Sequence, residues 1–333
     1  MIRFLLLSAL ALPAVALAAP LPEGAGKAAG VLVLDDCDEQ YRGKATYSDN
    51  LTLFDATAKQ TFRVSGFNNC QSIGSSRMVA TDAKRKCVWV IENVAHRIRR
   101  FDLAGKETLS IGEVHGSAIA VDAETGNVWA LAGKGQIGSG KTVVYDDTGK
   151  EVASHDVSGW DIVYDRKAKA FWIAEKKLTK ITPRGDVLFS VDVSTWCASS
   201  VDVDPRSGAA WVAVREHPQV AGSSNRLLKF DADGKELAAV DLGEKNPFRV
   251  SVDPKDGKVW VAHFMKSVER FSADGKSEVE YPVEALTLQA DPGGRDAWVV
   301  TPTEVQRMTP KGDVTHRAGH AGKTSQAWVA ALE

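Results

Sequence analysis

Three residues of this 333-residue chain have side chains suited to acid/base chemistry and stand at comparable positions along the sequence: His115, Glu175 and His263. Glu175 and His263 each follow a Trp by three residues, and His115 stands just before the Val/Ala-rich segment 117–121. Imidazole and carboxylate groups act as general acids and bases, and both can ligate a divalent cation. The three are therefore the candidate catalytic residues, and a divalent cation is the candidate cofactor.

A second set of side chains suits the binding of a polar small molecule. It comprises a carboxylate, an imidazole, two guanidinium groups and three aromatic rings: Glu92, Trp160, Trp196, Arg215, His217, Phe248 and Arg249. Ligand pockets combine aromatic walls with a few polar groups in this way. The alternative interpretation is that these are ordinary surface residues of a soluble protein, in which the aromatic rings only cover the core.

An internal repeat gives both sets their positions. Six Asp residues recur at spacings of 40, 43, 39, 49 and 38 residues, and each is followed seven residues later by a Trp. The pairs are Asp82/Trp89, Asp122/Trp129, Asp165/Trp172, Asp204/Trp211, Asp253/Trp260 and Asp291/Trp298. Six of the nine Trp therefore occupy one phase of one repeat, which chance placement would almost never produce.

A second marker shares this period. Six apolar residues are each followed four positions later by Gly: Phe101, Tyr145, Ile181, Phe230, Phe271 and Met308. Turn-forming residues ending in Gly predict a tight hairpin. With the Val-rich segments before each Asp and around each Trp, every unit of ~40 residues reads as four short antiparallel strands. The predicted fold is an all-β propeller of four-stranded blades, in which each Trp packs between adjacent blades.

The two ends of the chain decide the number of blades. Val31–Asp35 resembles a first strand, residues 53–59 resemble the hairpin, and the Trp position falls near Arg42 or Gly43. Residues 325–332 lie where a further first strand would start. Either the N-terminal unit is a full blade or the C-terminal strand joins N-terminal strands to close the ring. Both arrangements give seven blades, and six result if residues 31–65 pack outside the ring.

The string Ala120-Val121-Asp122, continued by Gly126-Asn127-Val128-Trp129 and accompanied by hairpins such as 99–105, resembles NHL-repeat propellers. It is similar as well to the related streptogramin-lyase and SMP-30/gluconolactonase-like propellers. The resemblance covers nearly all of the chain after residue 30 and implies the propeller architecture. It does not by itself imply an activity, because propellers serve as scaffolds, receptors and enzymes.

Two metal-dependent activities occur within the resembled families. Streptogramin lyases carry a His before a first strand and a His/Glu pair with magnesium, and His115, His263 and Glu175 match them in residue type and phase, without the Pro-His-Gly context. Gluconolactonase-like enzymes hold a divalent cation through a Glu, an Asn and an Asp. Glu92 and Asn93 match the first two, and no Asp partner follows from the sequence.

Residues in the same phase of the repeat lie on the same face of the ring, so function can be placed by rim. The turns between strands one and two and between strands three and four share one regular rim. The loops between strands two and three and between blades form the opposite, irregular rim, where the candidate residues fall. The longest of these loops includes residues 215–225, and a Gly-rich one includes residues 133–140. We expect a non-catalytic propeller that binds a small molecule, peptide or protein on this rim; the alternative is a metal-assisted lyase or lactonase at the channel mouth.

Composition narrows the remaining choices. A formal charge of −2 gives no reason to expect nucleic acid as a partner. Residues 1–18 read as a signal peptide, 19–30 as a linker and 31–333 as one propeller domain, with no membrane span. Export to a periplasm or out of the cell would permit one or two disulfides among the four cysteines, in any of three connectivities. The cysteines are Cys37, Cys70, Cys87 and Cys197.

Overall fold

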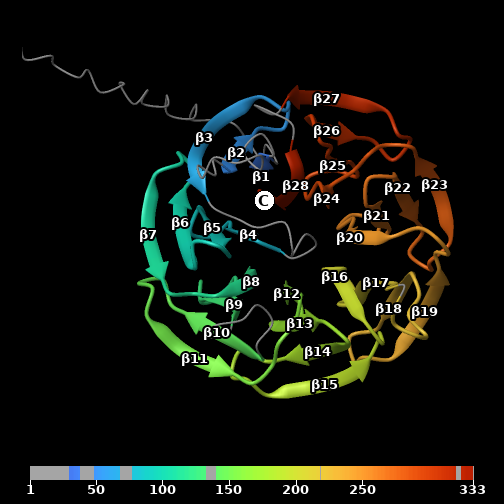
Figure 1. Cartoon of the computed structure of the whole chain (residues 1–333), viewed down its shortest axis with the longest axis horizontal. Coiled ribbons are helices and arrows are strands. Elements are labelled where there is room, and N and C mark those ends of the chain that lie inside the picture. The colour runs from blue at the N-terminus through green and yellow to red at the C-terminus, as the bar shows by residue number, and fades with distance from the viewer. Residues whose placement is uncertain are drawn as a thin grey trace, which may run out of the picture.

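The computed structural model describes residues 30–37, 49–67, 77–132, 140–217, 219–319 and 324–332. Within these ranges the chain has no helix and forms seven four-stranded antiparallel sheets arranged in a ring (Figure 1). The protein is therefore a seven-bladed β-propeller, as the Trp spacing predicts, and the six-blade alternative is wrong. The expected signal peptide and the expected linker up to residue 29 lie outside the described residues.

The blades are numbered here in chain order, with each blade's innermost strand first. Blade 1 consists of β4 (Val79–Asp82), β5 (Cys87–Glu92), β6 (Arg97–Asp102) and β7 (Glu107–Gly112), and blade 2 of β8 (Gly116–Val121), β9 (Val128–Ala132), β10 (Lys141–Tyr145) and β11 (Glu151–His155). Blade 3 consists of β12 (Asp161–Asp165), β13 (Ala170–Ala174), β14 (Lys177–Ile181) and β15 (Val187–Asp192), and blade 4 of β16 (Cys197–Val203), β17 (Ala210–Arg215), β18 (Arg226–Phe230) and β19 (Glu236–Asp241). Blade 5 consists of β20 (Pro247–Val252), β21 (Val259–His263), β22 (Ser267–Phe271) and β23 (Ser277–Tyr281), and blade 6 of β24 (Thr287–Ala290), β25 (Ala297–Val300), β26 (Glu304–Met308) and β27 (Val314–Gly319). Blade 7 consists of β28 (Thr324–Ala331), β1 (Val31–Cys37), β2 (Asp49–Phe54) and β3 (Gln60–Phe67).

Burial decreases from the inner to the outer strand of each blade. The second strands, such as β5 and β9, are buried along their whole length because neighbouring blades cover both of their faces. The outer strands β7, β15 and β19 alternate between half-buried and exposed residues. A strand covered on both faces favours continuous apolar residues, whereas a strand with one wet face favours alternation. The core therefore lies between the blades rather than at one centre.

The six repeated Trp side chains pack between blades as predicted, each at most 1% exposed. In five of these blades a basic residue on the third strand lies over the Trp ring, with its cationic group 4.7–5.8 Å from the ring centroid. Four of these residues also donate to a carbonyl in the hairpin of the next blade: Arg100 to Asp147, Lys180 to Ala232, Lys229 to Ala273 and Arg307 to Ala56. These inter-blade hydrogen bonds could not be predicted from the sequence, because the accepting backbone carbonyl can belong to any residue type.

Blade 7 joins the two ends of the chain. The strand expected near residues 325–332 is β28, and it pairs with β1 from Val31↔Ala331 to Cys37↔Thr324. Because β28 takes the innermost place, β1 is the second strand of its blade, and the interpretation of Val31–Asp35 as a first strand is wrong. Val31 pairs with Phe54 as Val88 pairs with Phe101, so the Trp position belongs to Leu32 and not to Arg42 or Gly43.

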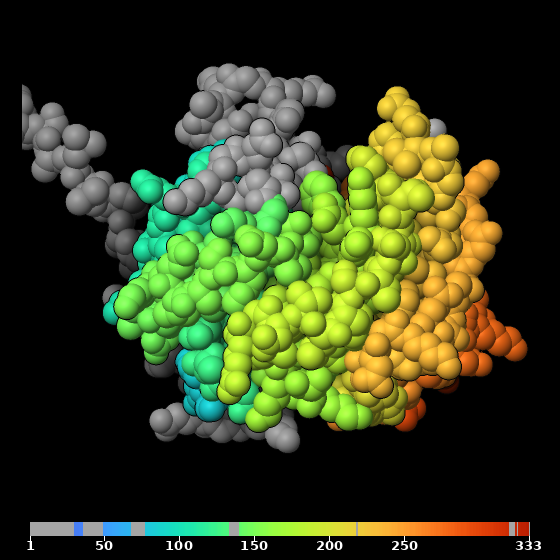
Figure 2. Space-filling model, turned by 90° about the horizontal axis from the view of Figure 1, so that it is seen from below, coloured from blue at the N-terminus to red at the C-terminus, as the bar shows by residue number. Residues whose placement is uncertain are grey.

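The two rims differ as the repeat predicts. On the regular rim, each hairpin Gly has a positive φ, as at Gly105 (84°), and in blade 7 Ala58 (60°) takes this position. Figure 2 shows the ring edge-on, with the blades side by side and the loop between β17 and β18 projecting from the upper edge. That loop lies on the irregular rim.

Two of the four cysteines, Cys87 and Cys197, are free and buried, so neither forms a disulfide. Of the expected one or two bridges, the alternative of two is therefore wrong. The side chains of Cys37 and Cys70 lie outside the described residues. No helix in the described part of the chain is long and apolar enough to cross a membrane.

The contact between His155 and Trp129, both in blade 2, is sensitive to pH. The ring of His155 stacks on Trp129 at 5.0 Å, and burial lowers its pKa. Because the fold favours the neutral ring, the unfolded chain binds more protons as the pH falls through the ordinary His pKa of about 6.5. We expect the urea midpoint to fall between pH 7 and pH 5, and to fall less in His155→Phe. A pH profile in His155→Phe that equals the wild-type profile would contradict this account.

Candidate ligand-binding site

An open pocket of about 410 Å³ lies on the irregular rim, over blades 4 and 5. Its lining comes from the connection before β16, the end of β17 with the loop that follows, and the connection before β20. The lining residues are Trp196, Arg215, Glu216, His217, Asn225 and Asn246. Three of the seven predicted ligand-binding residues, Trp196, Arg215 and His217, therefore meet in one concave site, and the longest loop of the rim forms part of its wall.

Arg215 is the last residue of β17 and the one cation among the lining residues. Its Nε donates to Oδ1 of Asn246 (2.9 Å), and its guanidinium carbon lies 5.3 Å from the ring centroid of Phe248. Burial lowers the pKa of Arg215. No Asp or Glu lies within 4.0 Å of this guanidinium in the described part of the chain. The pocket thus contains a half-buried positive charge without a carboxylate partner.

The long loop after β17 is held by hydrogen bonds around Asn225 and Ser223. Asn225 accepts from the backbone N–H of Glu216 (2.9 Å) and donates to Oε2 of Glu216 (3.3 Å) and to the carbonyl of Gly243 (2.9 Å). Ser223 accepts from the N–H of His217 (3.0 Å) and donates to its carbonyl. These hydrogen bonds hold the loop in place as part of the pocket wall, so in this conformation it is not an open lid.

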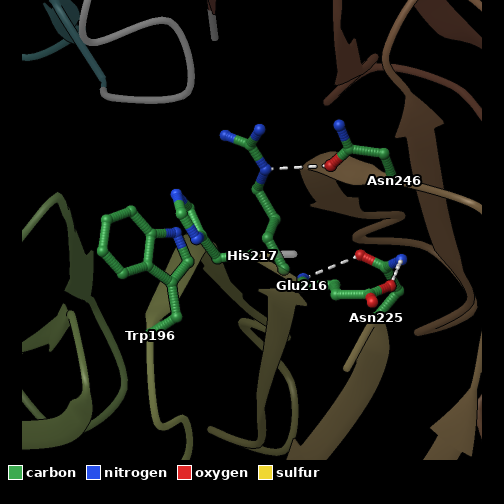
Figure 3. Close-up of a pocket in the computed structure, with 6 residues that line it drawn as sticks. Trp196, Glu216, His217, Asn225 and Asn246 are labelled. Atoms are coloured by element: carbon green, nitrogen blue, oxygen red, sulfur yellow. Dashed lines mark hydrogen bonds between the residues drawn. The ribbon is translucent and has the colours of Figure 1, made fainter. Parts of the chain in front are cut away.

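His217 and Trp196 form an aromatic side of the pocket. Their ring centroids are 4.3 Å apart, and Figure 3 shows the two side chains together, across the pocket from Asn246. Gln219 donates its N–H to Nδ1 of His217 (3.2 Å), so the neutral ring carries its proton on Nε2. Trp196 remains 38% exposed, which is high for an indole. This side offers a flat apolar surface beside an N–H donor.

A cluster of charged and polar side chains, from buried His263 and Glu269 to exposed Glu280, fixes the segment that carries Asn246. Lys245 donates to Glu269 and to Glu280, both at 2.7 Å, and Glu269 also contacts Nε2 of His263 at 3.0 Å. Burial alone would raise the pKa of Glu269, but hydrogen bonds from His263, Lys245 and Ser277 outweigh it and lower this pKa to about 2. The cluster is a charged anchor, and Asn246 is the next residue after Lys245.

The three candidate catalytic residues take part in separate contacts. The tilted ring of His115 packs against His96 with a centroid distance of 3.7 Å, Oε2 of Glu175 accepts from Ser158 (3.4 Å), and His263 is fully buried against Glu269. Within the described ranges, no group of three or more His, Cys, Asp or Glu side chains is arranged to hold a metal ion. Their catalytic role remains a prediction.

The other predicted binding residues lie outside the pocket. Glu92 is buried in ion pairs with Arg97 (2.8 Å) and Arg99 (3.3 Å). Phe248 is 6% exposed and lies behind Arg215. The backbone N–H of Trp160 donates to the carbonyl of Ala174, and the Trp160 side chain does not line the pocket.

Arg249 belongs to an ion-pair network among the innermost strands. Its Nη1 lies 3.3 Å from Oδ2 of Asp161, an oxygen that also accepts from the N–H of Val201 (3.0 Å). Arg77, just before β4, reaches Asp161 at 3.7 Å and Asp202 at 3.6 Å. Strands of blades 1, 3, 4 and 5 are therefore tied together by two guanidinium groups and two carboxylates. Desolvation lowers the pKa of Arg249 to about 10.

Cys197 lies beside the pocket but is a poor nucleophile. It pairs with Arg215 across β16 and β17, is 8% exposed, and burial raises its pKa to about 12. The thiolate is the reactive form, so this sulfur stays protonated and unreactive at neutral pH.

The fold and pocket define a seven-bladed propeller with a polar pocket on its irregular rim, and comparisons with known proteins agree at the level of the fold. No family model matches the chain, and no curated protein matches it. Among solved structures, hydrazine synthase of Kuenenia stuttgartiensis has a TM-score of 0.61 at 14% identity, covering 83% of this chain and 93% of that one. Virginiamycin B lyase from Staphylococcus aureus has a TM-score of 0.59 at 14% identity, covering 77% and 88%. Both are β-propellers, and at this identity the similarity shows the fold alone.

Proposed function

We propose that this chain is a binding propeller that holds a small molecule in the pocket over blades 4 and 5. The observation that supports this most directly is Arg215, whose half-buried guanidinium has no carboxylate partner in the described part of the chain. A buried charge without a partner is costly, and a ligand of opposite charge offsets that cost. The pocket volume, about 410 Å³, is in the range of small-molecule sites and favours such a ligand over a protein partner.

The alternative, a metal-assisted lyase or lactonase at the channel mouth, has less support. It needs His115, Glu175 and His263 to share one substrate or one cation. Each of them instead has its own neighbour: His96, Ser158 and Glu269 respectively. The geometry therefore favours binding without catalysis.

Export to an oxidising compartment is part of the proposal, because residues 1–18 have the pattern of a signal peptide. With Cys87 and Cys197 free, the remaining pair is Cys37 with Cys70. Strands β1 and β3 run parallel in blade 7, so both end at the irregular rim. Cys37 is the last residue of β1, and Cys70 follows the end of β3 by three residues. We propose that these two form the one disulfide.

Thiol counting tests this assignment. Burial raises the pKa of Cys87 to about 11 and that of Cys197 to about 12, so both thiols should be unreactive in the folded chain. We expect an aromatic disulfide reagent to titrate no thiol in the folded, exported protein and two after unfolding without reductant. Mass spectrometry of a non-reduced digest should contain a Cys37–Cys70 cross-linked peptide. Four thiols after unfolding would contradict the disulfide, and fast reaction in the folded state would contradict the burial argument.

The binding function itself is tested with a matched pair of rim tryptophans. A library of small fragments is screened against the mature protein by ligand-observed NMR, and each hit is titrated against Trp196→Ala and Trp160→Ala. We expect the best hits to weaken at least fivefold with Trp196→Ala, because that ring lines the pocket, and to be unchanged with Trp160→Ala. Hits that ignore Trp196→Ala would contradict the pocket. Turnover of a lactone or macrocyclic ester, lost in His263→Ala or Glu175→Ala, would contradict the non-catalytic role.

A further inference from the structure

The polar side of the pocket consists mainly of N–H donors that the protein does not satisfy. The Nε of Arg215 is used by Asn246, and neither Nη atom of Arg215 has a hydrogen-bond partner in the described part of the chain. The same bond occupies Oδ1 of Asn246, which leaves its Nδ2 without a partner among those residues. The Nη groups of Arg215 and the Nδ2 of Asn246 can therefore donate several hydrogen bonds to one acceptor group, and Nε2 of His217, on the aromatic side, carries the proton of the neutral ring.

The guanidinium is also held in a fixed orientation. One edge is bonded through Nε to Asn246 at 2.9 Å, and Phe248, itself supported by Phe264 at 4.8 Å, lies 5.3 Å from the guanidinium carbon. A planar guanidinium with a free pair of N–H groups matches the two oxygens of a carboxylate. Because the orientation is set before the ligand arrives, binding loses less side-chain entropy.

The charges around Arg215 limit the ligand to a single negative charge. Glu216 lines the same pocket. A lining with one cation and one carboxylate favours a monoanion and opposes a dianion such as a phosphate monoester, since like charges repel at short range.

The aromatic side selects the rest of the ligand. Trp196 is 38% exposed and packs against His217 on one side, so part of its indole faces the pocket. Aromatic rings bind flat apolar groups by burial and by stacking.

We propose that the pocket binds a small monocarboxylate carrying a planar ring, with the carboxylate on Arg215 and Asn246 and the ring against Trp196. This inference rests on the proposed binding function and adds the chemical class of the ligand.

The test compares two probes of nearly equal shape, 3-phenylpropionate and its neutral amide 3-phenylpropionamide, by titration calorimetry on the mature protein. We expect the carboxylate to bind at least tenfold more tightly than the amide. Arg215→Gln should remove this difference, and Arg215→Lys, which keeps the charge but loses the paired N–H groups, should reduce it. Propionate, which lacks the ring, should bind the wild type at least fivefold more weakly than 3-phenylpropionate does. In Trp196→Ala, propionate and 3-phenylpropionate should bind with about the same affinity. Trp160→Ala should behave as wild type.

The outcomes separate the ligand class from the binding function. Equal binding of the acid and the amide, or tighter binding of phenyl phosphate than of 3-phenylpropionate, would overturn the ligand class and leave the pocket as a binding site. Neutral fragments that occupy the pocket while 3-phenylpropionate does not bind would have the same meaning. A pocket that binds neither probe and no fragment would overturn the binding function together with this inference.

Discussion

Replacing Asp161 with Ala is expected to lower the free energy of unfolding by ~3–5 kcal/mol, because it leaves the buried Arg249 guanidinium without its carboxylate. Asp161 is 0% and Arg249 3% exposed, and Oδ2 of Asp161 is bonded to the N–H of Val201 and to Oγ of Ser200 as well as to Arg249. The substitution therefore removes a charge and leaves several buried hydrogen-bond donors without an acceptor. Urea unfolding followed by Trp fluorescence measures the effect, since urea does not screen ion pairs as guanidinium chloride does.

Two variants show whether the loss comes from the unpaired charge. Asp192→Ala removes a carboxylate from the outer strand of the same blade, where the side chain is 85% exposed and lies 3.9 Å from Lys177. It should change stability by less than about 0.5 kcal/mol. The double variant Asp161→Ala/Arg249→Met removes both charges and should recover at least half of the loss. An Asp161→Ala loss no larger than that of Asp192→Ala would show that the network contributes little.

The ring could be predicted from the sequence because its strongest signal is periodic. Every Trp such as Trp89 or Trp260 must fill the same space between two blades, so the sequence repeats with the structure. Blade 7, whose strands come from both ends of the chain, does not follow the Trp repeat. There Leu32 takes the Trp position and Leu53 takes the position of the basic residue, so neither marker is present.

The site could be predicted only as far as loop length and rim position go. The long loop after β17 pointed to Arg215 and His217. Phase within the repeat, however, places a residue at a rim without saying whether its side chain faces water, a neighbouring blade or the channel. That is why Glu92, Arg249 and His263 were expected on the irregular rim but are buried, Glu92 and Arg249 in ion pairs and His263 in a hydrogen bond with Glu269.

The residues that sequence reasoning missed have partners far along the chain. Asn246 is oriented by Arg215, 31 residues earlier, and Arg77 reaches strands more than 80 residues away. Such pairings depend on the closed ring, and no local pattern records them. A signal was nevertheless present for Asn246, which stands two residues before the flagged Phe248 in a blade connection.

Ending the chain at residue 323 is expected to abolish cooperative folding, because it removes β28 and leaves blade 7 without its innermost strand. Ala327, Trp328, Val329 and Ala330 are each at most 7% exposed, and β28 contacts both β24 and β4. Burial of Trp328 and Val329 alone contributes roughly 3–6 kcal/mol, a large share of a typical stability of about 5–15 kcal/mol. Loss of the near-UV circular dichroism signal and of a sigmoidal urea transition would be the measured result.

A peptide added in trans separates loss of the strand from a general defect of the shortened chain. A synthetic peptide of residues 324–333 supplies the same hydrogen-bonding edge to β1 and the same Trp328, so it should restore the near-UV signal at a concentration above its dissociation constant. The same peptide with Trp328→Ala keeps the backbone edge but loses the buried indole, and it should bind at least tenfold more weakly. In the full-length chain, Trp328→Ala should cost ~3–5 kcal/mol. A shortened chain that unfolds with the wild-type midpoint would show that the other six blades hold the ring without its closing strand.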